Sequence, residues 1–330
     1  MRPPAFWYRR ASWQSVLLFP LGALAASATA RRVAKDPEVR PGVPVVCVGN
    51  INLGGTGKTP TVIALIEALS GQSMAAHVVS RGYGGSLEGP VQVDPAKHTA
   101  DEVGDEPLLL AAFAPVWIAK DRAAGARAAE AAGAQCIVLD DGFQNPSVAK
   151  DLNLVVVDAG VGFGNGRVVP AGPLREWPEM GLARADAVVL IGSDAEQDAF
   201  VERWSRQLRD LPVLRARLEP VMTGMDWSAV RAVAFAGIGR PEKFFATLEG
   251  LGAKIVARHA LDDHQAIPPA LLERLRAEAR DLGAQLVTTE KDLMRLPPKA
   301  QREVMTVMVR LAFADPAGLK ALLSPQALRR

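Results

Sequence analysis

Residues 49–60 read Gly-Asn-Ile-Asn-Leu-Gly-Gly-Thr-Gly-Lys-Thr-Pro, and they directly follow the apolar run 43–48. The apolar run predicts a buried strand, and the apolar residues 61–69 beyond the loop predict a helix. Glycines in such a loop let successive backbone N–H groups point at phosphate oxygens, and the start of a helix attracts anions. The chain is therefore predicted to be an α/β protein that binds the phosphates of a nucleoside triphosphate.

The loop follows the pattern G-x-x-x-x-G-K-[ST] except at its first position, where this chain has Asn52. Asparagine tolerates left-handed backbone angles better than most residues. Lys58 is expected to reach the β- and γ-phosphates, and the Thr59 hydroxyl to hold Mg²⁺. The alternative is a flexible connector without a ligand, but the strand–loop–helix context favours phosphate binding. The predicted nucleotide-binding residues are Asn52, Leu53, Gly54, Gly55, Thr56, Gly57, Lys58 and Thr59.

The rest of the chain alternates apolar strand-like runs with helical stretches, as a doubly wound, mostly parallel sheet of the P-loop NTPase type requires. At 330 residues the chain is long enough for two α/β domains. The alternation restarts in the last third, which predicts a P-loop core domain at 41–220 and a smaller C-terminal α/β domain at 221–330 that would close over the phosphate site. The expected strands are 43–48, 76–80, 116–119, 136–139, 154–157, 187–191 and 213–217, then 230–235, 254–257, 285–289 and 304–310.

Residues 1–40 form a separate segment that is both basic and apolar. Trp13–Ala30 carries no charge. It resembles a secretory signal peptide at Ala28-Thr-Ala30, although export would remove the protein from its nucleotide. A spanning helix needs about 20 apolar residues, and a helix packed on the core is a further alternative. We favour an amphipathic segment lying in the membrane interface, where aromatic rings and arginines are stabilised. Its charged residues are Arg2, Arg9, Arg10, Arg31, Arg32, Lys35 and Arg40, against Asp36 and Glu38.

Two carboxylates, Asp140 and Asp141, end the apolar run 136–139. A carboxylate at a strand end beside a phosphate loop commonly orders the Mg²⁺ of a nucleotide. Adjacent side chains on a strand point opposite ways, so at most one of the two is expected to face the metal directly. The alternative is a turn, for which Asp-Asp-Gly is a common composition, and the context favours metal binding by at least one of the pair.

Further polar residues have two interpretations each. Asp105 stands at a predicted helix start, where it would serve as a cap. His264 follows Asp263 in a polar loop of the second domain, where a lone histidine is usually solvated. An Asp and a His from opposite domains would, however, suit removal of a hydroxyl proton across a cleft. Arg175 and Glu176 end a long loop rich in glycine and proline, which is either a phosphate clamp or a solvated connector.

Taken together, these segments resemble the tetraacyldisaccharide 4′-kinase family, the lipid A 4′-kinases of Gram-negative bacteria. They run in the family's order across nearly the whole chain, which makes the resemblance specific. A loop with an atypical first position is usual in that family, whereas Gln265 is a departure, because a second histidine often follows the Asp-His pair. The segments are 48–60 (VGNINLGGTGKTP), 80–84 (SRGYG), 104–107 (GDEP), 140–144 (DDGFQ), 164–167 (GNGR), 170–176 (PAGPLRE), 234–239 (AFAGIG), 263–264 (DH) and 289–292 (TEKD).

The resemblance implies an ATP- and Mg²⁺-dependent kinase. It would transfer the γ-phosphate of ATP to the 4′-hydroxyl of a tetraacylated glucosamine disaccharide 1-phosphate, giving lipid IVA. Asp105, assisted by His264, is the implied proton acceptor, and Arg122 is a weaker match to a site residue. By resemblance the catalytic residues are Asp105, His264, Lys58, Arg175 and Glu176, and the metal ligands are Thr59, Asp140 and Asp141.

The resemblance also implies a peripheral or monotopic enzyme on the cytoplasmic face of the inner membrane, with the N-terminal segment on the membrane surface. The acylated disaccharide lipid is its expected partner, and neither a nucleic acid nor an obligate protein partner is expected. The alternative from another class is a membrane-docked switch ATPase that acts through a protein partner, since residues 54–59 resemble the loop of such proteins. Their extra lysine before the glycine pair is missing here, because Leu53 occupies that position.

Overall fold

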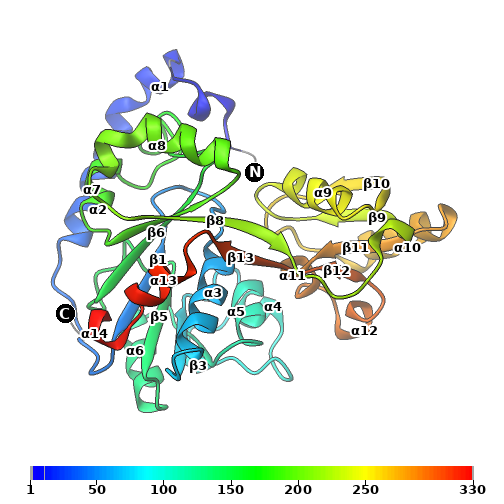
Figure 1. The fold of residues 1–330 in the computed structure, drawn as a ribbon, viewed down its shortest axis with the longest axis horizontal. Coiled ribbons are helices and arrows are strands. Elements are labelled where there is room, and N and C mark those ends of the chain that lie inside the picture. Colours follow the sequence, from blue (N-terminus) through cyan, green and yellow to red (C-terminus); the bar gives the residue numbers. More distant parts are fainter. Residues whose placement is uncertain (1–2, 11, 329–330) are drawn as a thin grey trace.

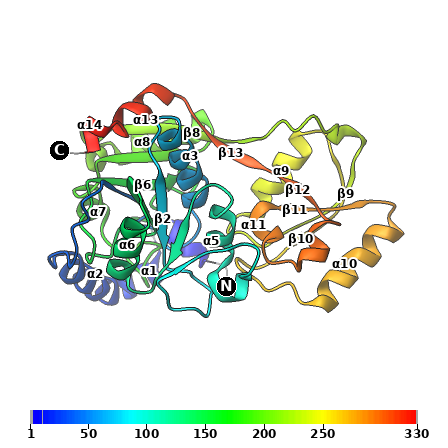
Figure 2. The ribbon, with the colours of Figure 1, turned by 90° about the horizontal axis from the view of Figure 1, so that it is seen from below.

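The computed structural model describes residues 3–10 and 12–328, so Arg2 of the predicted basic segment lies outside the described residues. Within that part, two α/β units lie side by side and are joined by two long strands (Figures 1 and 2). The larger unit is built on a nine-stranded sheet and the smaller on a four-stranded sheet. The predicted α/β fold with a doubly wound, mostly parallel sheet is confirmed.

The larger sheet has the strand order β13-β8-β7-β6-β1-β5-β2-β4-β3. Neighbouring strands are parallel except at the two edges, where β13 pairs with β8 and β3 with β4 in antiparallel fashion. Because β1 lies between β5 and β6, the carboxyl ends of these three strands meet around the phosphate loop. The strands are β1 Val45–Gly49, β2 Ala76–Ser80, β3 Val91–Gln92, β4 Val116–Ile118, β5 Cys136–Asp140, β6 Leu152–Asp158, β7 Ala187–Ile191, β8 Val213–Pro220 and β13 Val309–Phe313.

Helices cover both faces of this sheet, each over its own apolar core. On one face α3, α5 and the C-terminal helices bury aliphatic side chains such as Leu65 and Leu110. On the other face α6 and α8 pack beside residues 163–174, with Phe163 fully buried. The helices of the larger unit are α3 Lys58–Ser70, α4 Ala100–Val103, α5 Asp105–Leu110, α6 Arg122–Ala131, α7 Pro178–Leu182, α8 Asp194–Leu208, α13 Pro316–Leu322 and α14 Pro325–Leu328.

The smaller unit is a parallel sheet in the order β10-β9-β11-β12, with helices on both faces. Phe245 of α9 and Leu275 of α10 are buried in its two cores. Its elements are η2 Trp227–Ala229, β9 Arg231–Ala236, α9 Pro241–Gly250, β10 Lys254–Ala260, α10 Pro269–Asp281, β11 Gln285–Thr289, α11 Glu290–Leu293, α12 Pro298–Gln301 and β12 Met305–Val307.

The predicted single strand 304–310 is wrong, because the chain changes sheets within it. β12 ends at Val307 and β13 begins at Val309. Between them the Met308 carbonyl accepts a hydrogen bond of 2.9 Å from the Val221 N–H, so the chains entering and leaving the smaller unit run together. Residues 309–328 therefore pack on the larger sheet, not in the C-terminal domain where the sequence placed them. An apolar run does not reveal which of two sheets receives it.

The N-terminal segment forms three short helices along the outside of the larger unit: η1 Ala5–Tyr8, α1 Trp13–Leu17 and α2 Phe19–Val33 (Figure 1). One side packs closely: a Cβ on Gly22 would meet the Val168 carbonyl oxygen at 2.7 Å. In the described part of the chain, none of the helices combines the length and the hydropathy that a membrane span needs. The opposite side exposes Trp13, Val16, Leu17, Phe19, Leu21 and Leu24.

Candidate active site

The phosphate loop between β1 and α3 is shaped by its own residues. The Asn50 side-chain amide donates hydrogen bonds of 3.1 Å to the Gly54 carbonyl and to the Thr56 hydroxyl. Gly57 has φ +97°, and a Cβ there would lie 2.5 Å from Cδ1 of Ile191, so only glycine fits. The chain thus turns directly into α3, whose first two residues are Lys58 and Thr59.

The first half of the loop is paired with the segment that carries Arg175. The Leu53 N–H donates to the Pro173 carbonyl at 2.7 Å, and the Arg175 N–H donates to the Ile51 carbonyl at 2.7 Å. The buried Asn52 side chain donates to the Gly162 carbonyl at 2.8 Å. The predicted contacts of Asn52 and Leu53 with nucleotide are therefore not supported, because their donors are already used by residues 162–173.

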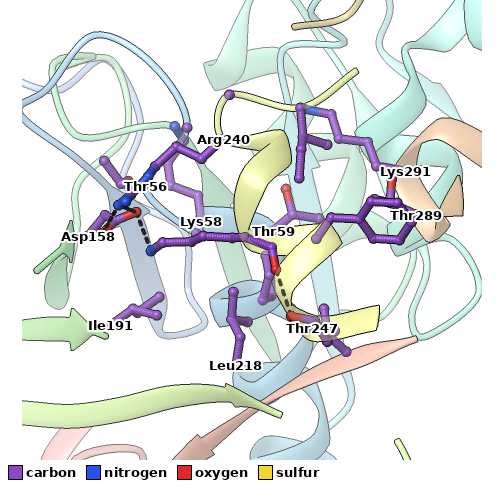
Figure 3. Close-up of a pocket in the computed structure, with 18 of the residues that line it drawn as sticks. Thr56, Lys58, Thr59, Asp158, Ile191, Leu218, Arg240, Thr247, Thr289 and Lys291 are labelled. Carbon is purple, nitrogen blue, oxygen red and sulfur yellow. Dashed lines mark hydrogen bonds and ion pairs between the residues drawn. The ribbon is translucent and has the colours of Figure 1, made fainter. Parts of the chain in front are cut away.

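A cavity of about 780 Å³ lies between the two units, in front of this loop (Figure 3). Gly55–Thr59 line one end of it, whereas Gly54 does not line it. Leu218, Phe244, Val307 and Val309 give the other end an apolar wall. The space has a polar and an apolar end, as a nucleotide requires.

Asp140 and Asp141 both reach the site. Asp140 is buried, and its Oδ2 accepts a 2.9 Å hydrogen bond from Ser80, while Oδ1 has no partner among the described residues. Burial, with the nearby charges of Glu106 and Asp141, raises the pKa of Asp140 to about 7. Asp141 has φ +51°, a left-handed backbone angle, so its carboxylate does not follow the alternating side-chain directions of the strand. It lies 3.7 Å from the Lys58 ammonium.

Asp105 and His264, which are 159 positions apart, meet across the two units. His264 Nδ1 lies 3.1 Å from Asp105 Oδ2. The same oxygen accepts a 2.7 Å hydrogen bond from Arg295 Nε. Burial alone would raise the pKa of Asp105, but the hydrogen bond from His264 and the charges of Lys291 and Arg295 hold it well below its usual range. His264 has φ +56°, a strained conformation of the kind that is common at functional sites.

The contact with Lys291 indicates which ring nitrogen of His264 donates and which accepts. Its ammonium lies 3.0 Å from His264 Nε2 and 3.0 Å from the Glu106 carboxylate. Burial would lower the pKa of Lys291, but Glu106 and Asp105 raise it, so the side chain stays charged and donates. Nε2 is therefore the acceptor, and the imidazole proton sits on Nδ1, directed at Asp105. Sequence reasoning left residues 289–292 without a role, and their place beside a histidine in another loop has no local signal.

Arg175 and Glu176 have different surroundings. Arg175 Nη1 lies 3.0 Å from Asp141 and 3.2 Å from Gln144, so it belongs to the site. Glu176 is 3% exposed and accepts hydrogen bonds of 2.8 Å from Arg184 and from Gln144. The structure thus places Glu176 behind the site as a support for Gln144, rather than facing the cavity. The buried Arg122 donates to the backbone carbonyls of Asp140 and Asp141 and holds that strand end.

A second group of charges, which sequence reasoning missed, lies at the polar end of the cavity. Asp158 ends β6 and accepts hydrogen bonds from Arg240 at 2.9 Å and from Lys243 at 2.7 Å (Figure 3). The two cations come from the smaller unit and the carboxylate from the larger. All three side chains line the cavity.

Comparison with known proteins identifies similar chains over the whole length. A family model described as tetraacyldisaccharide-1-P 4′-kinase matches residues 14–327. A tetraacyldisaccharide 4′-kinase of Dinoroseobacter shibae is 61% identical, and the alignment covers 100% of both chains. One of a Jannaschia species is 56% identical over 96% of each chain. A crystal structure of LpxK from Aquifex aeolicus in complex with ATP has a TM-score of 0.75 and 26% identity, covering 94% of this chain and 98% of that one.

Proposed function

This chain belongs to the tetraacyldisaccharide 4′-kinase family, and from that premise we propose how its own residues carry out the reaction. The enzyme transfers the γ-phosphate of ATP to the 4′-hydroxyl of a tetraacyldisaccharide 1-phosphate, giving lipid IVA in lipid A biosynthesis. The switch ATPase is not adopted, because the relatives that match the full chain are named as kinases. The contact between Asp105 and His264 across the two units carries the residue roles.

The triphosphate occupies the polar end of the cavity, and adenine the apolar end. The backbone N–H groups of Gly55–Thr59 surround the β-phosphate, and Lys58 reaches the β- and γ-oxygens. Asp141 contacts both the Lys58 ammonium and the Arg175 guanidinium, and it keeps these two cations beside the phosphoryl group that is transferred. Leu218, Phe244 and Val309 offer adenine an apolar wall on the side of the joining strands and α9.

The residues present fit a Mg²⁺ ion. Asp140 Oδ1 is a buried acceptor without a partner among the described residues, and burial raises the pKa of that carboxyl to about 7, which supports a cation beside it. Among the described residues no three His, Cys, Asp or Glu side chains are grouped to hold a metal. Mg²⁺ is usually held in proteins by one or two carboxylates together with phosphates and water. Thr59, Asp140 and, through water, Asp141 would hold it; when bound, it neutralises charge on the β- and γ-phosphates.

Asp105 accepts the proton of the attacking hydroxyl. As the bond between the 4′-oxygen and the γ-phosphorus forms, the bond from the γ-phosphorus to the bridging oxygen breaks and ADP leaves. The transition state of phosphoryl transfer is loose, so the attacking hydroxyl becomes acidic only late in the reaction, as its bond to phosphorus forms. A carboxylate with a lowered pKa accepts the proton at that stage. His264 donates from Nδ1 to Asp105 while its Nε2 accepts from Lys291, and in this way it orients Asp105 and stabilises its charge.

The exposed apolar side of α1 and α2 docks the enzyme on the membrane. Residues 163–175 connect this side to the chemistry: the Ala171 carbonyl accepts a 2.6 Å hydrogen bond from Ser15, and Arg167 donates to the Ser15 carbonyl at 2.8 Å. Arg175, at the end of the same segment, contacts Asp141. A lipid in the bilayer would therefore meet the site beside the docked helices. Since ATP is available inside the cell, we place this surface on the cytoplasmic face of the inner membrane.

The test is incubation of the purified protein with γ-labelled ATP and the tetraacylated disaccharide 1-phosphate in mixed micelles. We expect label in a lipid product with one additional phosphate, and none when the substrate lacks its 4′-hydroxyl. ATP hydrolysis without a labelled lipid would contradict the assignment.

A further inference from the structure

The cavity is charged at one end and apolar at the other, and α9 follows it in the same order. Arg240, Lys243, Phe244 and Thr247 all line the cavity. Arg240 is the residue just before α9, and the spacing of Lys243, Phe244 and Thr247 places these three on one side of the helix. At 1.5 Å per residue, the helix covers about 10 Å between its cationic end and Thr247, which is comparable to the distance between the phosphates and the base of an extended nucleotide.

The cationic end of α9 lies against the phosphate loop. A Cβ on Gly239 would be 3.6 Å from the backbone nitrogen of Gly55, so the turn before Arg240 touches the part of the loop that lines the cavity. The Arg240 side chain runs from this turn toward Asp158 and Thr56 (Figure 3). Its side chain is 37% exposed and that of Lys243 is 34% exposed, so both are open to a ligand.

The two cations share one carboxylate as their hydrogen-bond partner. Asp158 is 8% exposed in its side chain and is shared by Arg240 and Lys243. The other carboxylates that line this end have partners of their own: Glu196 accepts hydrogen bonds from Ser193, and Asp194 pairs with Arg217. Arg240 and Lys243 therefore pair with a carboxylate at a partly exposed site, where an anionic ligand can compete for them.

We propose that Arg240 and Lys243 form a second phosphate-binding pair, supplied by the smaller unit, and that Asp158 is the carboxylate with which they pair until a triphosphate displaces it. This rests on the proposed function, because the ligand is the triphosphate of ATP. Arg240 follows the turn that touches Gly55, so its guanidinium contacts the oxygens on the γ side, where a planar two-pronged donor is most effective. Lys243, whose Nζ meets the same Asp158 carboxylate as Arg240, contacts neighbouring phosphate oxygens.

Calorimetric titration of the full-length protein with ATP, ADP and AMP tests this assignment. In Arg240→Ala and in Lys243→Ala, the loss of a charge-assisted contact should weaken ATP binding on the order of 10- to 100-fold. In Arg240→Ala the affinity for ADP should fall less than the affinity for ATP, and the affinity for AMP should not change. The control is Arg258→Ala, which removes an arginine of the same unit that pairs with Glu249 outside the cavity.

The Asp158→Asn variant separates phosphate binding from a structural bridge between the units. If the cations bind phosphate, ATP affinity in this variant should be unchanged or tighter, because the carboxylate that competes for them is gone. If they only bridge the units, Asp158→Asn and Arg240→Ala should weaken ATP, ADP and AMP alike, and the proposal would be overturned. Unchanged ATP affinity in Arg240→Ala, with Lys58→Ala weakened, would also overturn it while leaving the kinase assignment intact.

Discussion

Replacing Asp105 with asparagine removes one charge from a buried contact between the two units. Asp105 and Arg295 are 5% and 8% exposed in their side chains, and their atoms are 2.7 Å apart. Removing one partner of a buried ion pair costs about 3–5 kcal/mol. Asparagine keeps the shape of the side chain and one oxygen acceptor, so we expect the free energy of unfolding to fall by an amount near the lower end of that range. The fall should be larger for Asp105→Ala, which leaves Arg295 without that acceptor.

The same substitution should lower turnover on the order of 10²-fold or more, the usual scale for a lost general base. ATP affinity should stay within about twofold, because Asp105 does not line the nucleotide cavity and the net charge of the phosphate loop is unchanged. The split between turnover and ATP affinity distinguishes a proton acceptor from a nucleotide-binding residue.

The pH dependence of stability gives a further check. The lowered pKa of Asp105 means that its charged form is stabilised by folding. The contribution of Asp105 to the free energy of unfolding is therefore complete above the ordinary aspartate pKa of about 3.9, and it is lost as the pH falls through the pKa of the folded state. The difference in Tm between the wild-type enzyme and Asp105→Asn should be constant from about pH 6 to pH 8 and should narrow only below about pH 4.

The assays are steady-state kinetics with the lipid substrate, calorimetry with ATP and thermal unfolding at several pH values. Asp101→Asn, an exposed aspartate on the preceding helix α4, is the matched control and should leave all three unchanged. Full turnover in Asp105→Asn would remove Asp105 from the role of proton acceptor. An equal loss of turnover and ATP affinity would instead show that the substitution disturbs the closure of the two units.

Three further predictions address the phosphate loop, the metal and the membrane. Lys58→Ala should raise the KM for ATP and lower kcat, each by about 10-fold or more, and unchanged kinetics would contradict the loop assignment. Asp140→Asn should raise the Mg²⁺ concentration needed for half-maximal rate by about 10-fold with little change in Tm; an unaltered magnesium dependence would exclude it as a ligand. Leu21→Glu with Leu24→Glu, both on the exposed side of α2, should reduce co-sedimentation with anionic vesicles without lowering Tm, and equal co-sedimentation would refute docking through this face.

The strands of both sheets were largely predictable because each is a short apolar run bounded by turn residues. Ala76–Ser80, Ala187–Ile191 and Gln285–Thr289 have the bounds that the sequence predicted. The exit of the chain from the smaller unit was not predictable. Val307 and Val309 read as one strand, yet they belong to different sheets, because pairing is decided by partners that are distant in the sequence.

Residues of the site were predictable where a local pattern or the family resemblance marked them. Lys58 and Thr59 begin α3, as the loop pattern requires, and the resemblance alone linked Asp105 to His264. Lys291 was noted within residues 289–292 but received no role, and Arg295 was not singled out, because both act through residues of another loop or the other unit. Asn52 was assigned to the nucleotide from its position in the pattern, but the fold uses its amide to hold Gly162.

Residues 163–175 connect the side of α1 and α2 that we propose to dock on the membrane with the phosphate loop. A solvated connector was one interpretation of this glycine- and proline-rich segment, yet Phe163, Val168 and Leu174 are fully buried. Its backbone pairs with the phosphate loop at Leu53, and its other side receives Ser15. Because the segment is packed between the N-terminal helices and the phosphate loop, the exposed apolar side of α1 and α2 has a fixed position relative to the site. A kinase whose acceptor stays in a bilayer needs that fixed relation, since the hydroxyl must meet the γ-phosphate at the membrane surface rather than in solution.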